Sequence, residues 1–336
     1  MRRLVDAFAR CKIRASATSQ PMMLQTDDNP EANRLKNGVT DVQLEAAVRV
    51  SGYPLQRVVA EELLPMFEVT EEWGYVDRET NDRRALDVFA YRKLKETAAL
   101  WISLALLVEC KRSDLPFVFF TAAAPRVPRE FPVIAGLRGK PVELHFKGAG
   151  STSAPASRVL GLHDFPFVSS AAPTCSAFSR AERKGKDLDL SGTVPFNQVV
   201  LPLVSALKHF LDLQKTIDSQ ARVPACLAHP ICVIDAPMVL VGGGLENPRL
   251  TMTPWVRLVR QEAIKEKNQG FWRHYVIDCV HRGYVTTFVQ ERLLPFAEQF
   301  AERAASIDAL LAEGKAGVPD LENWTFADLR PSKQPG

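Results

Sequence analysis

The sequence predicts an α/β protein in which a mixed central β-sheet is flanked by helices, and three observations support this fold class. A helix comes first, because the apolar residues of 55–66 recur at three- and four-residue spacing. Three strand-like segments then follow one another, at 67–77, 84–90 and 104–111. An amphipathic helix at 197–215 precedes a further strand at 231–241, which completes a sheet with helical cover.

The remaining segments add to this core. We expect a short helix at 42–50, added strands at 255–259 and 275–280, and a long C-terminal helix at 284–311. Residues 121–195 are rich in proline and contain a glycine–serine stretch, which favours loops and short strands over helices. We therefore predict a disordered N-terminal extension at 1–40, a single domain at 41–313 and a loosely held tail at 314–336. Within the domain, the core motif spans 52–120 and a loop-rich insertion spans 121–195.

Composition is that of a globular protein and restricts the function classes. The chain has 336 residues, of which 46% are hydrophobic and 24% charged, so it can bury a large core. A net charge of +3 excludes binding to nucleic acid through bulk charge and leaves only local patches. No apolar run approaches the ~20 residues that span a bilayer, so we expect no membrane span. Six scattered cysteines indicate a reducing compartment, the cytoplasm.

Two acids and a lysine stand on neighbouring predicted strands. Asp87 interrupts an apolar strand, where alternation puts it on the face of Phe89 and Tyr91, and Glu109 and Lys111 end the apolar run of the next strand. Because residues two apart in a strand share a face, Glu109 and Lys111 emerge on the same side of the sheet. If the strands pair, Asp87 and Glu109 approach one another closely enough to share one cation.

These residue types suit metal-assisted hydrolysis of a phosphodiester. Carboxylate oxygens favour Mg²⁺ or Mn²⁺ over zinc, and such an ion lowers the pKa of its bound water. An ammonium such as that of Lys111 orients the water and offsets developing negative charge. The alternative is that Asp87 is a strand-edge acid and that Glu109 and Lys111 form a surface ion pair, since Glu-x-Lys alone is very common.

The order of a helix, a strand, a strand with Asp87 and a strand with Glu109-Cys110-Lys111 resembles the restriction endonuclease-like, or PD-(D/E)xK, nuclease superfamily. The resemblance covers about residues 52–120 and extends more loosely to about 311. It implies that Asp87, Glu109 and the backbone carbonyl of Cys110 bind magnesium, and that Lys111 assists the water. The family's proline before the aspartate is Leu86 here, a departure that many members share.

A further acid often comes from the family's first helix. Glu62 falls within the apolar stripe of the predicted helix 55–66, whereas Glu61 faces away. An acid inside an apolar face is costly unless it is paired or bound to metal, which favours Glu62 as a supporting ligand. Two alternatives stay open: that Glu62 only extends from the edge of the stripe to solvent, or that the family's acid aligns with Gln56.

Candidate groups for nucleic-acid binding lie in the basic segment 180–186, namely Arg180, Arg183, Lys184 and Lys186. They suit contacts to backbone phosphates, although an exposed charged loop is an equally good interpretation. Rival sites are weaker. The evenly spaced set Cys226, His229 and Cys232 resembles half of a zinc site but includes no C-x-x-C pair.

We therefore expect a magnesium- or manganese-dependent nuclease that cuts DNA, in phage defence, restriction or repair. The DNA preference follows from the resemblance alone. Small members of the family often act as dimers, so a homodimer or a larger defence or repair assembly is compatible with it. The alternative is a catalytically inactive module of the same fold that binds nucleic acid or a protein partner.

Overall fold

The structure is a computed structural model that describes most of the chain. The described residues are 25–121, 127–128, 131–139, 141–146, 150–170, 172–215, 222–244, 246–263, 272–319 and 324–331. The chain divides into two compact units, residues 1–54 and 55–336. This boundary lies later in the sequence than the predicted one near residue 40. Residues 1–24 of the predicted disordered extension lie outside the described residues.

The first unit contains helix α1 (Asp41–Val50), which confirms the predicted short helix. Its start is fixed by a capping box. Oγ1 of Thr40 accepts the backbone N–H of Gln43, and the Gln43 side chain accepts the N–H of Thr40 at 3.0 Å. None of its residues is buried, so packing within this unit contributes little to the helix.

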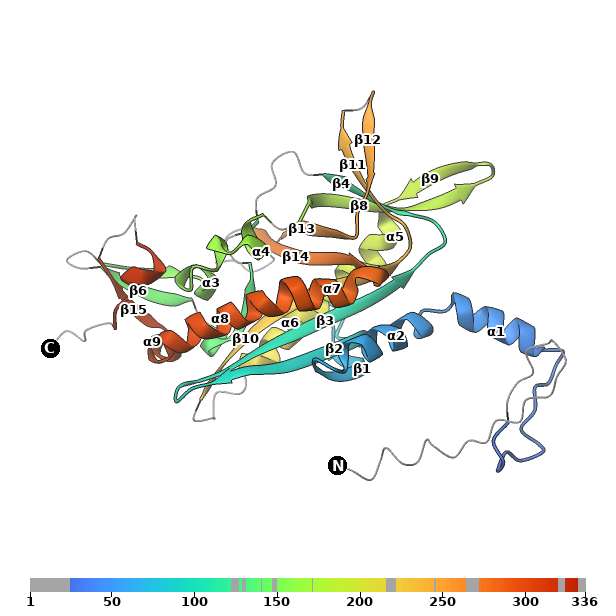
Figure 1. Ribbon diagram of the computed structural model, residues 1–336, viewed down its shortest axis with the longest axis horizontal. Coiled ribbons are helices and arrows are strands. Elements are labelled where there is room, and N and C mark those ends of the chain that lie inside the picture. Colours follow the sequence, from blue (N-terminus) through green and yellow to red (C-terminus); the bar gives the residue numbers. More distant parts are fainter. Residues whose placement is uncertain are drawn as a thin grey trace. The chain divides into compact units, whose positions relative to one another are not determined.

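The second unit is built on a large mixed sheet (Figure 1), and this confirms the predicted α/β class. Among the described residues the sheet has twelve strands. Ten of them follow one another in the order β1 (Glu68–Val76), β2 (Arg83–Glu96), β3 (Leu100–Arg112), β10 (Val223–Asp235), β14 (Trp272–His281), β13 (Trp255–Ala263), β8 (Thr174–Lys184), β4 (Phe117–Thr121), β11 (Met238–Gly243) and β12 (Pro248–Met252). The other two, β5 (Val133–Gly136) and β9 (Asp187–Ser191), pair with β10 and β8.

Strands β1, β2 and β3 form an antiparallel meander, and β10 then lies parallel to β3 along its full length. The return from β3 to β10 includes helix α6 (Leu201–Lys215). The connection between β2 and β3 is a tight turn, because both strands extend well beyond the predicted ranges 84–90 and 104–111. Oγ1 of Thr97 accepts the backbone N–H groups of Ala99 and Leu100, which closes this turn.

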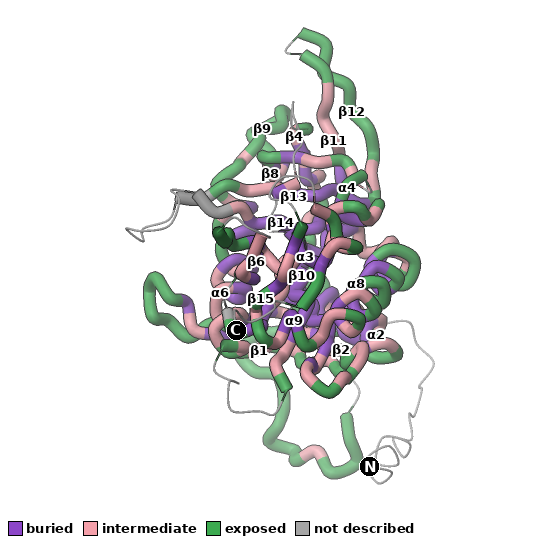
Figure 2. The backbone as a smooth tube through the Cα atoms, turned by 90° about the vertical axis from the view of Figure 1, so that its left-hand side faces the viewer, coloured by how far each residue is buried: buried purple, intermediate pink, exposed green. Residues whose placement is uncertain are grey.

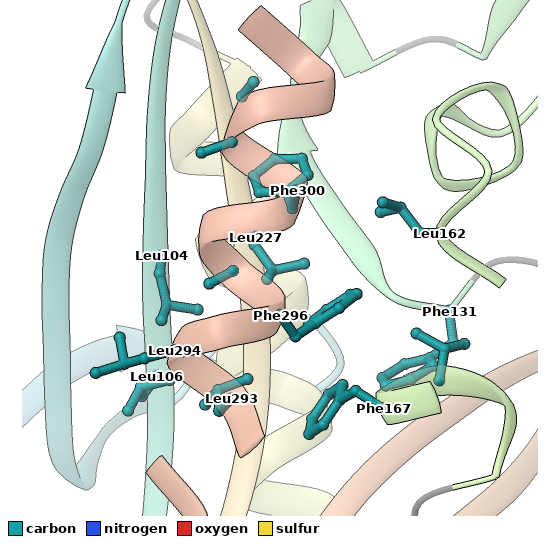
Figure 3. Close-up of a cluster of buried hydrophobic side chains, with 14 of the residues drawn as sticks. Leu104, Leu106, Phe131, Leu162, Phe167, Leu227, Leu293, Leu294, Phe296 and Phe300 are labelled. Atoms are coloured by element: carbon teal, nitrogen blue, oxygen red, sulfur yellow. The ribbon is translucent and has the colours of Figure 1, made fainter. Parts of the chain in front are cut away.

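Helices cover both faces of the meander and β10 (Figures 1 and 3). One face packs against α2 (Tyr53–Leu63), α7 (Val285–Phe288), α8 (Leu294–Ser306) and α9 (Asp308–Glu313). The other face packs against α6, whose Leu203, Leu207 and Phe210 are buried. Figure 3 shows Phe296 and Phe300 of α8 among buried leucines of β3 and β10. The predicted helix 197–215 is confirmed, and the predicted helix 284–311 is broken at Ile307.

Two predictions for the second half of the chain need correction. The predicted strand 231–241 is two strands, β10 and β11, because the chain turns at Pro237 and β11 pairs with β4 instead of β3. The predicted tail contributes strand β15 (Lys315–Val318), which pairs with β6 (Val142–Phe146) in a small sheet completed by β7 (Ser151–Ala154). Ala316 and Val318 are buried there, so apolar packing holds this segment.

The described part of the insertion 121–195 also includes three short α-helices, α3 (Ala156–Val159), α4 (Pro166–Ser169) and α5 (Thr193–Pro195). Burial is greatest along β3 and β10, whereas β12 is exposed throughout (Figure 2). None of the helices in the described ranges has the length and apolar character needed to cross a lipid bilayer.

Candidate functional site

At Glu72 and Asp87, the regular alternation of side chains between the two faces of the sheet is interrupted in both β1 and β2. Regular pairs flank this point: Glu71 with Val88, and Trp73 with Leu86. Glu72 has a left-handed φ of 53°, which costs a non-glycine residue roughly 1–2 kcal/mol. Val88 packs in the core beneath α2 and α8, whereas Leu86 packs in the core beneath α6. The alternation of side chains along β2, counted from Phe89, therefore does not predict the face to which the Asp87 side chain points.

The side chain of Asp87 continues the hydrogen bonding between β2 and β3 beyond their last regular pair. That pair is Val88 with Val108. Two residues further along β3, the backbone N–H of Cys110 donates to Oδ2 of Asp87 at 2.6 Å. Since the N–H and C=O of one strand residue point to the same neighbouring strand, the Cys110 carbonyl also faces the side of β2. Asp87 is thus fixed at the residue that follows Glu109.

Glu109 and Lys111 form an ion pair near the end of β3. Lys111 Nζ lies 2.6 Å from Oε1 of Glu109. The pair is largely inside the protein, because Glu109 is only 6% exposed. The second carboxylate oxygen, Oε2, is buried and accepts no hydrogen bond from any described residue. A buried acceptor without a donor costs about 1–3 kcal/mol, so this atom is suited to a ligand that the protein itself does not supply.

Burial and neighbouring charges raise the pKa of both acids. Burial raises the pKa of Glu109 to about 7; Lys111 lowers it, and the charge of Asp87 raises it. Burial also raises the pKa of Asp87, and the hydrogen bond from Cys110 and the charge of Lys111 only partly offset this effect. The structure thus places Asp87 against the backbone of the residue after Glu109, and it pairs Glu109 with Lys111.

Glu62 does not join this group. Its contact is with Oγ1 of Thr286, which donates to the Glu62 carboxylate at 3.3 Å. The reason is the side of the sheet that α2 covers. Helix α2 packs on the face that carries Val108 and Cys110, and Glu109, between them in the strand, points to the opposite face. The same holds for α2 as a whole, so the alternative ligand Gln56, which is buried, is also on the other face.

Glu72, an exposed residue of β1, is a further acid in this region that the sequence did not single out. Its charge contributes to the raised pKa of both Asp87 and Glu109. The signal was present in the sequence. Counting back from the turn 78–82 through an antiparallel pair places Glu72 opposite Asp87.

The donor set fits a hard divalent cation in chemical type. Asp87 and Glu109 offer carboxylate oxygens, the type of ligand that Mg²⁺ and Mn²⁺ take, and Oε2 of Glu109 is buried without a donor. Within the described ranges, however, no three His, Cys, Asp or Glu side chains already converge as a preformed metal cage. The arrangement is therefore two coupled acids with a lysine.

An open depression lies beyond the end of β3. Its lining comes from the loop after β3 and from β8: Ser113, Asp114, Leu115, Arg180, Ala181, Glu182 and Arg183. Two of the predicted phosphate-contacting residues, Arg180 and Arg183, thus line the same depression as residues 113–115, which follow the strand that carries Glu109 and Lys111. Acidic residues of the β8–β9 hairpin reduce the positive charge of the basic segment 180–186. Arg180 pairs with Glu182 at 3.0 Å, and Lys184 with Asp189 at 3.6 Å.

The rival zinc set does not converge. Cys226 and Cys232 pack on the α6 side of β10, whereas the ring of His229 lies on the other side among Phe131, Phe167 and Phe288. His229 belongs instead to a fully buried ion network. Its Nε2 lies 2.9 Å from Oδ2 of Asp278, and the Arg257 guanidinium donates to both Asp278 oxygens.

Comparison with known proteins adds no relative: no protein-family model matches the chain, and neither a curated protein nor a solved structure is significantly similar to it.

Proposed function

We propose that the protein is a metal-dependent nuclease that hydrolyses phosphodiester bonds, with Asp87, Glu109 and Lys111 as its catalytic residues. The observation that carries this proposal is the position of Glu109. It is buried, it is paired with Lys111 through one oxygen, and it keeps the other oxygen without a protein donor beside Asp87. A surface ion pair, the alternative interpretation, would be exposed and would leave no buried oxygen unsatisfied.

Each residue has a separate task in this proposal. Asp87 and Glu109 would hold Mg²⁺ or Mn²⁺, together with the backbone carbonyl of Cys110. When bound, the ion supplies a Lewis acid and a water of lowered pKa. The hydrogen bond from Cys110 holds the Asp87 carboxylate in place before any ligand arrives. Lys111, fixed by Glu109, would orient the attacking water and offset charge on the phosphate oxygens.

The topology supports the resemblance to the restriction endonuclease-like superfamily. Helix α2 is followed by the antiparallel strands β1, β2 and β3. After the intervening elements β4 to α5, the chain continues with α6 and β10, which lies parallel to β3. This is the order of helix, strand, strand with aspartate, strand with Glu-x-Lys, helix and strand that the sequence analysis expected. The remaining strands, from β14 to β12, would be additions to that core.

The substrate would approach along the depression beyond β3. Arg180 and Arg183 line it, and Lys184 and Lys186 follow in the same hairpin. Guanidinium groups bind phosphate oxygens through two parallel hydrogen bonds. Because these contacts carry no base information, they support a nucleic acid as substrate without indicating a sequence, and the resemblance favours DNA. Restriction, phage defence and repair all suit such an activity.

The experiment is an incubation of the purified protein with supercoiled plasmid, linear duplex, single-stranded DNA and RNA, with Mg²⁺ or Mn²⁺. Cleavage that EDTA stops, and that Asp87→Asn and Lys111→Met abolish, is the expected result. Unchanged cleavage by both variants would overturn the assignment of the site. No cleavage of any nucleic acid would instead favour an inactive module that binds nucleic acid or a protein.

A further inference from the structure

Strand β12 forms an outer edge of the large sheet. Within the described residues it pairs with β11 alone, and each of its residues is exposed (Figure 2). Its two large apolar side chains, Leu250 and Met252, are 68% and 67% exposed. An exposed edge of this kind is a template for another strand, because its backbone N–H and C=O groups have no partner in the sheet.

Two other outer strands, β1 and β9, carry features that oppose pairing with another chain. Strand β1 contains Glu71 and Glu72, and the backbone at Glu72 is left-handed, with a φ of 53°. Strand β9 alternates Asp187 and Asp189 with leucines. Acidic side chains and an irregular backbone both discourage the addition of a strand. Strand β12 contains no acid, and its only charged residue is Arg249. Of these three edges, β12 is therefore the one most open to pairing.

The hydrogen bonding of β12 shows which backbone groups point to its free edge. The N–H of Thr253, the residue after β12, donates to the backbone oxygen of Met238 in β11 at 3.1 Å. Because these groups alternate in direction along a strand, the N–H and C=O of Leu250 and Met252 point away from β11. The residues that would come next in this direction, on either side, are both prolines and have no N–H. The free edge therefore offers two donors, which belong to Leu250 and Met252.

We propose that β12 pairs with β12 of a second copy of the chain, antiparallel about a two-fold axis at Thr251, so that the large sheet continues through a homodimer. In this register Leu250 lies opposite Met252 of the second copy, and the two residues exchange both of their backbone hydrogen bonds. All the donors of both free edges are then used. Arg249 lies opposite Thr253 of the second copy, so like charges do not meet.

The side chains also favour a copy of the same chain as the partner. Leu250 and Met252 lie opposite Val241 and Val239 of β11, and opposite residues of an antiparallel pair share a face of the sheet. Two-fold pairing makes the apolar faces of the two β11–β12 hairpins continuous. A foreign strand would have to match both this face and the spacing between the prolines, whereas a second copy matches them by symmetry. No residue of the candidate site takes part, so the dimer does not depend on the proposed function.

Analytical ultracentrifugation of the full chain over a range of concentrations tests the proposal. One short strand covers less surface than the roughly 1,200–2,000 Å² of stable interfaces, so we expect dimers at about 100 μM that dissociate near about 1 μM. Leu250→Lys brings a charge from each copy into the interface and should weaken the dimer at least about tenfold. Leu188→Lys is the matched control, because Leu188 is 57% exposed on the acidic edge strand β9. Its dimer should match that of the wild type.

Cross-linking tests the register of the two strands. In the proposed dimer Thr251 faces Thr251 of the second copy with about 4.5 Å between their Cα atoms, which a disulfide can span. Thr251→Cys should therefore form a disulfide-linked dimer with oxidised glutathione, in excess of any that the wild type forms. Arg249→Cys is the control, because position 249 lies opposite Thr253 and not opposite itself.

Three results would overturn the proposal. The first is a wild type that stays monomeric at about 100 μM, and the second is a dimer that Leu250→Lys leaves unchanged. The third is cross-linking of Arg249→Cys as efficient as that of Thr251→Cys, which would contradict the register. None of these results bears on Asp87, Glu109 or Lys111, whose role is tested by cleavage.

Discussion

Oδ2 of Asp87 accepts the backbone N–H of Cys110 at 2.6 Å, so an acid of β2 is fixed at the end of β3 next to Glu109. The hydrogen bond forms where the regular pairing of the two strands stops, at Val88 and Val108. Beyond this point β2 has no regular pairs with β3, and the side chain of Asp87 links the two strands instead. The candidate site is thus a consequence of how the β1–β2–β3 meander ends.

Two substitutions of Asp87 separate its hydrogen bond with Cys110 from its proposed role in cleavage. Asp87→Asn keeps an oxygen that can accept the Cys110 N–H, so its free energy of unfolding should remain within about 1 kcal/mol of the wild type. Asp87→Ala loses the acceptor and should be less stable by about 1–3 kcal/mol. Both should lack metal-dependent cleavage. Urea denaturation and plasmid cleavage measure the two effects, and equal stability of the two variants would contradict the assigned hydrogen bond.

Removal of Lys111 should reduce cleavage by about 10²–10³-fold, the usual effect of losing one group that stabilises charge in the transition state. Lys111→Met retains most of the side-chain volume, and circular dichroism checks that it folds. Lys95→Met is the control, since Lys95 pairs with Glu302 on the surface. A similar loss in both variants would indicate a general effect of charge and not a catalytic one.

The buried network of Asp278 and Arg257 should contribute to stability and not to cleavage. Arg257 is 1% exposed and also donates to the backbone oxygen of Phe167 at 2.7 Å. Arg257→Met leaves Asp278 buried with only His229 as a partner, and we expect a loss of about 3–5 kcal/mol in the free energy of unfolding. Denaturant titration measures the loss. Cleavage per folded molecule should be unchanged, and a selective loss of cleavage would contradict this account.

The stability difference between the wild type and Asp77→Asn should depend on pH. Burial alone would raise the pKa of Asp77, but hydrogen bonds from the Glu79 and Thr80 backbone and from Ser205 of α6, with the charge of Arg84, lower it below 3.8. A lowered pKa stabilises the fold above the unfolded value and loses this effect as the pH falls through the folded value.

The wild type should therefore be more stable than Asp77→Asn by about 1–2 kcal/mol at pH 7 and pH 5, and the gap should narrow below about pH 4. Urea midpoints at several pH values measure it. Asp87 and Glu109, whose pKa values are raised, are present in both proteins and cancel in the difference. A gap that widens in acid would show that Asp77 is not stabilised as its carboxylate.

Arg183 should contribute to nucleic-acid binding through charge. It lines the depression beyond β3 and is exposed. Arg183→Ala should weaken DNA binding at low salt and reduce the slope of log affinity against log salt concentration by about one unit. Fluorescence anisotropy over a salt series measures the slope. Arg49→Ala is a control, because Arg49 lies on α1 and pairs with Glu45; an equal change in both slopes would argue against the assigned path.

The sequence was sufficient to predict the sheet core because its signals are local. The apolar run before Glu109 and the amphipathic pattern of 197–215 predicted β3 and α6 correctly. Pairing along β10 was not predicted, because the break at Pro237 assigns β10 and β11 to different neighbours far along the sheet. Such partners depend on the packing of the whole chain.

Only part of the candidate site was predicted, because the spacing of residues along one strand is a local signal and the packing of a helix on the sheet is not. Spacing of two in a strand gave Glu109 and Lys111 a common face, and the structure pairs them. The choice of Glu62 failed because periodicity shows which face of α2 is apolar, but not which face of the sheet α2 covers.

Anomalous diffraction from crystals soaked in Mn²⁺ tests the central claim most directly. The account predicts one strong manganese peak between the carboxylates of Asp87 and Glu109, at about 2.0–2.3 Å from their oxygens, that is absent in Asp87→Asn. Well-ordered crystals that show no peak at these acids, with Oε2 of Glu109 still buried and unpaired, would contradict it.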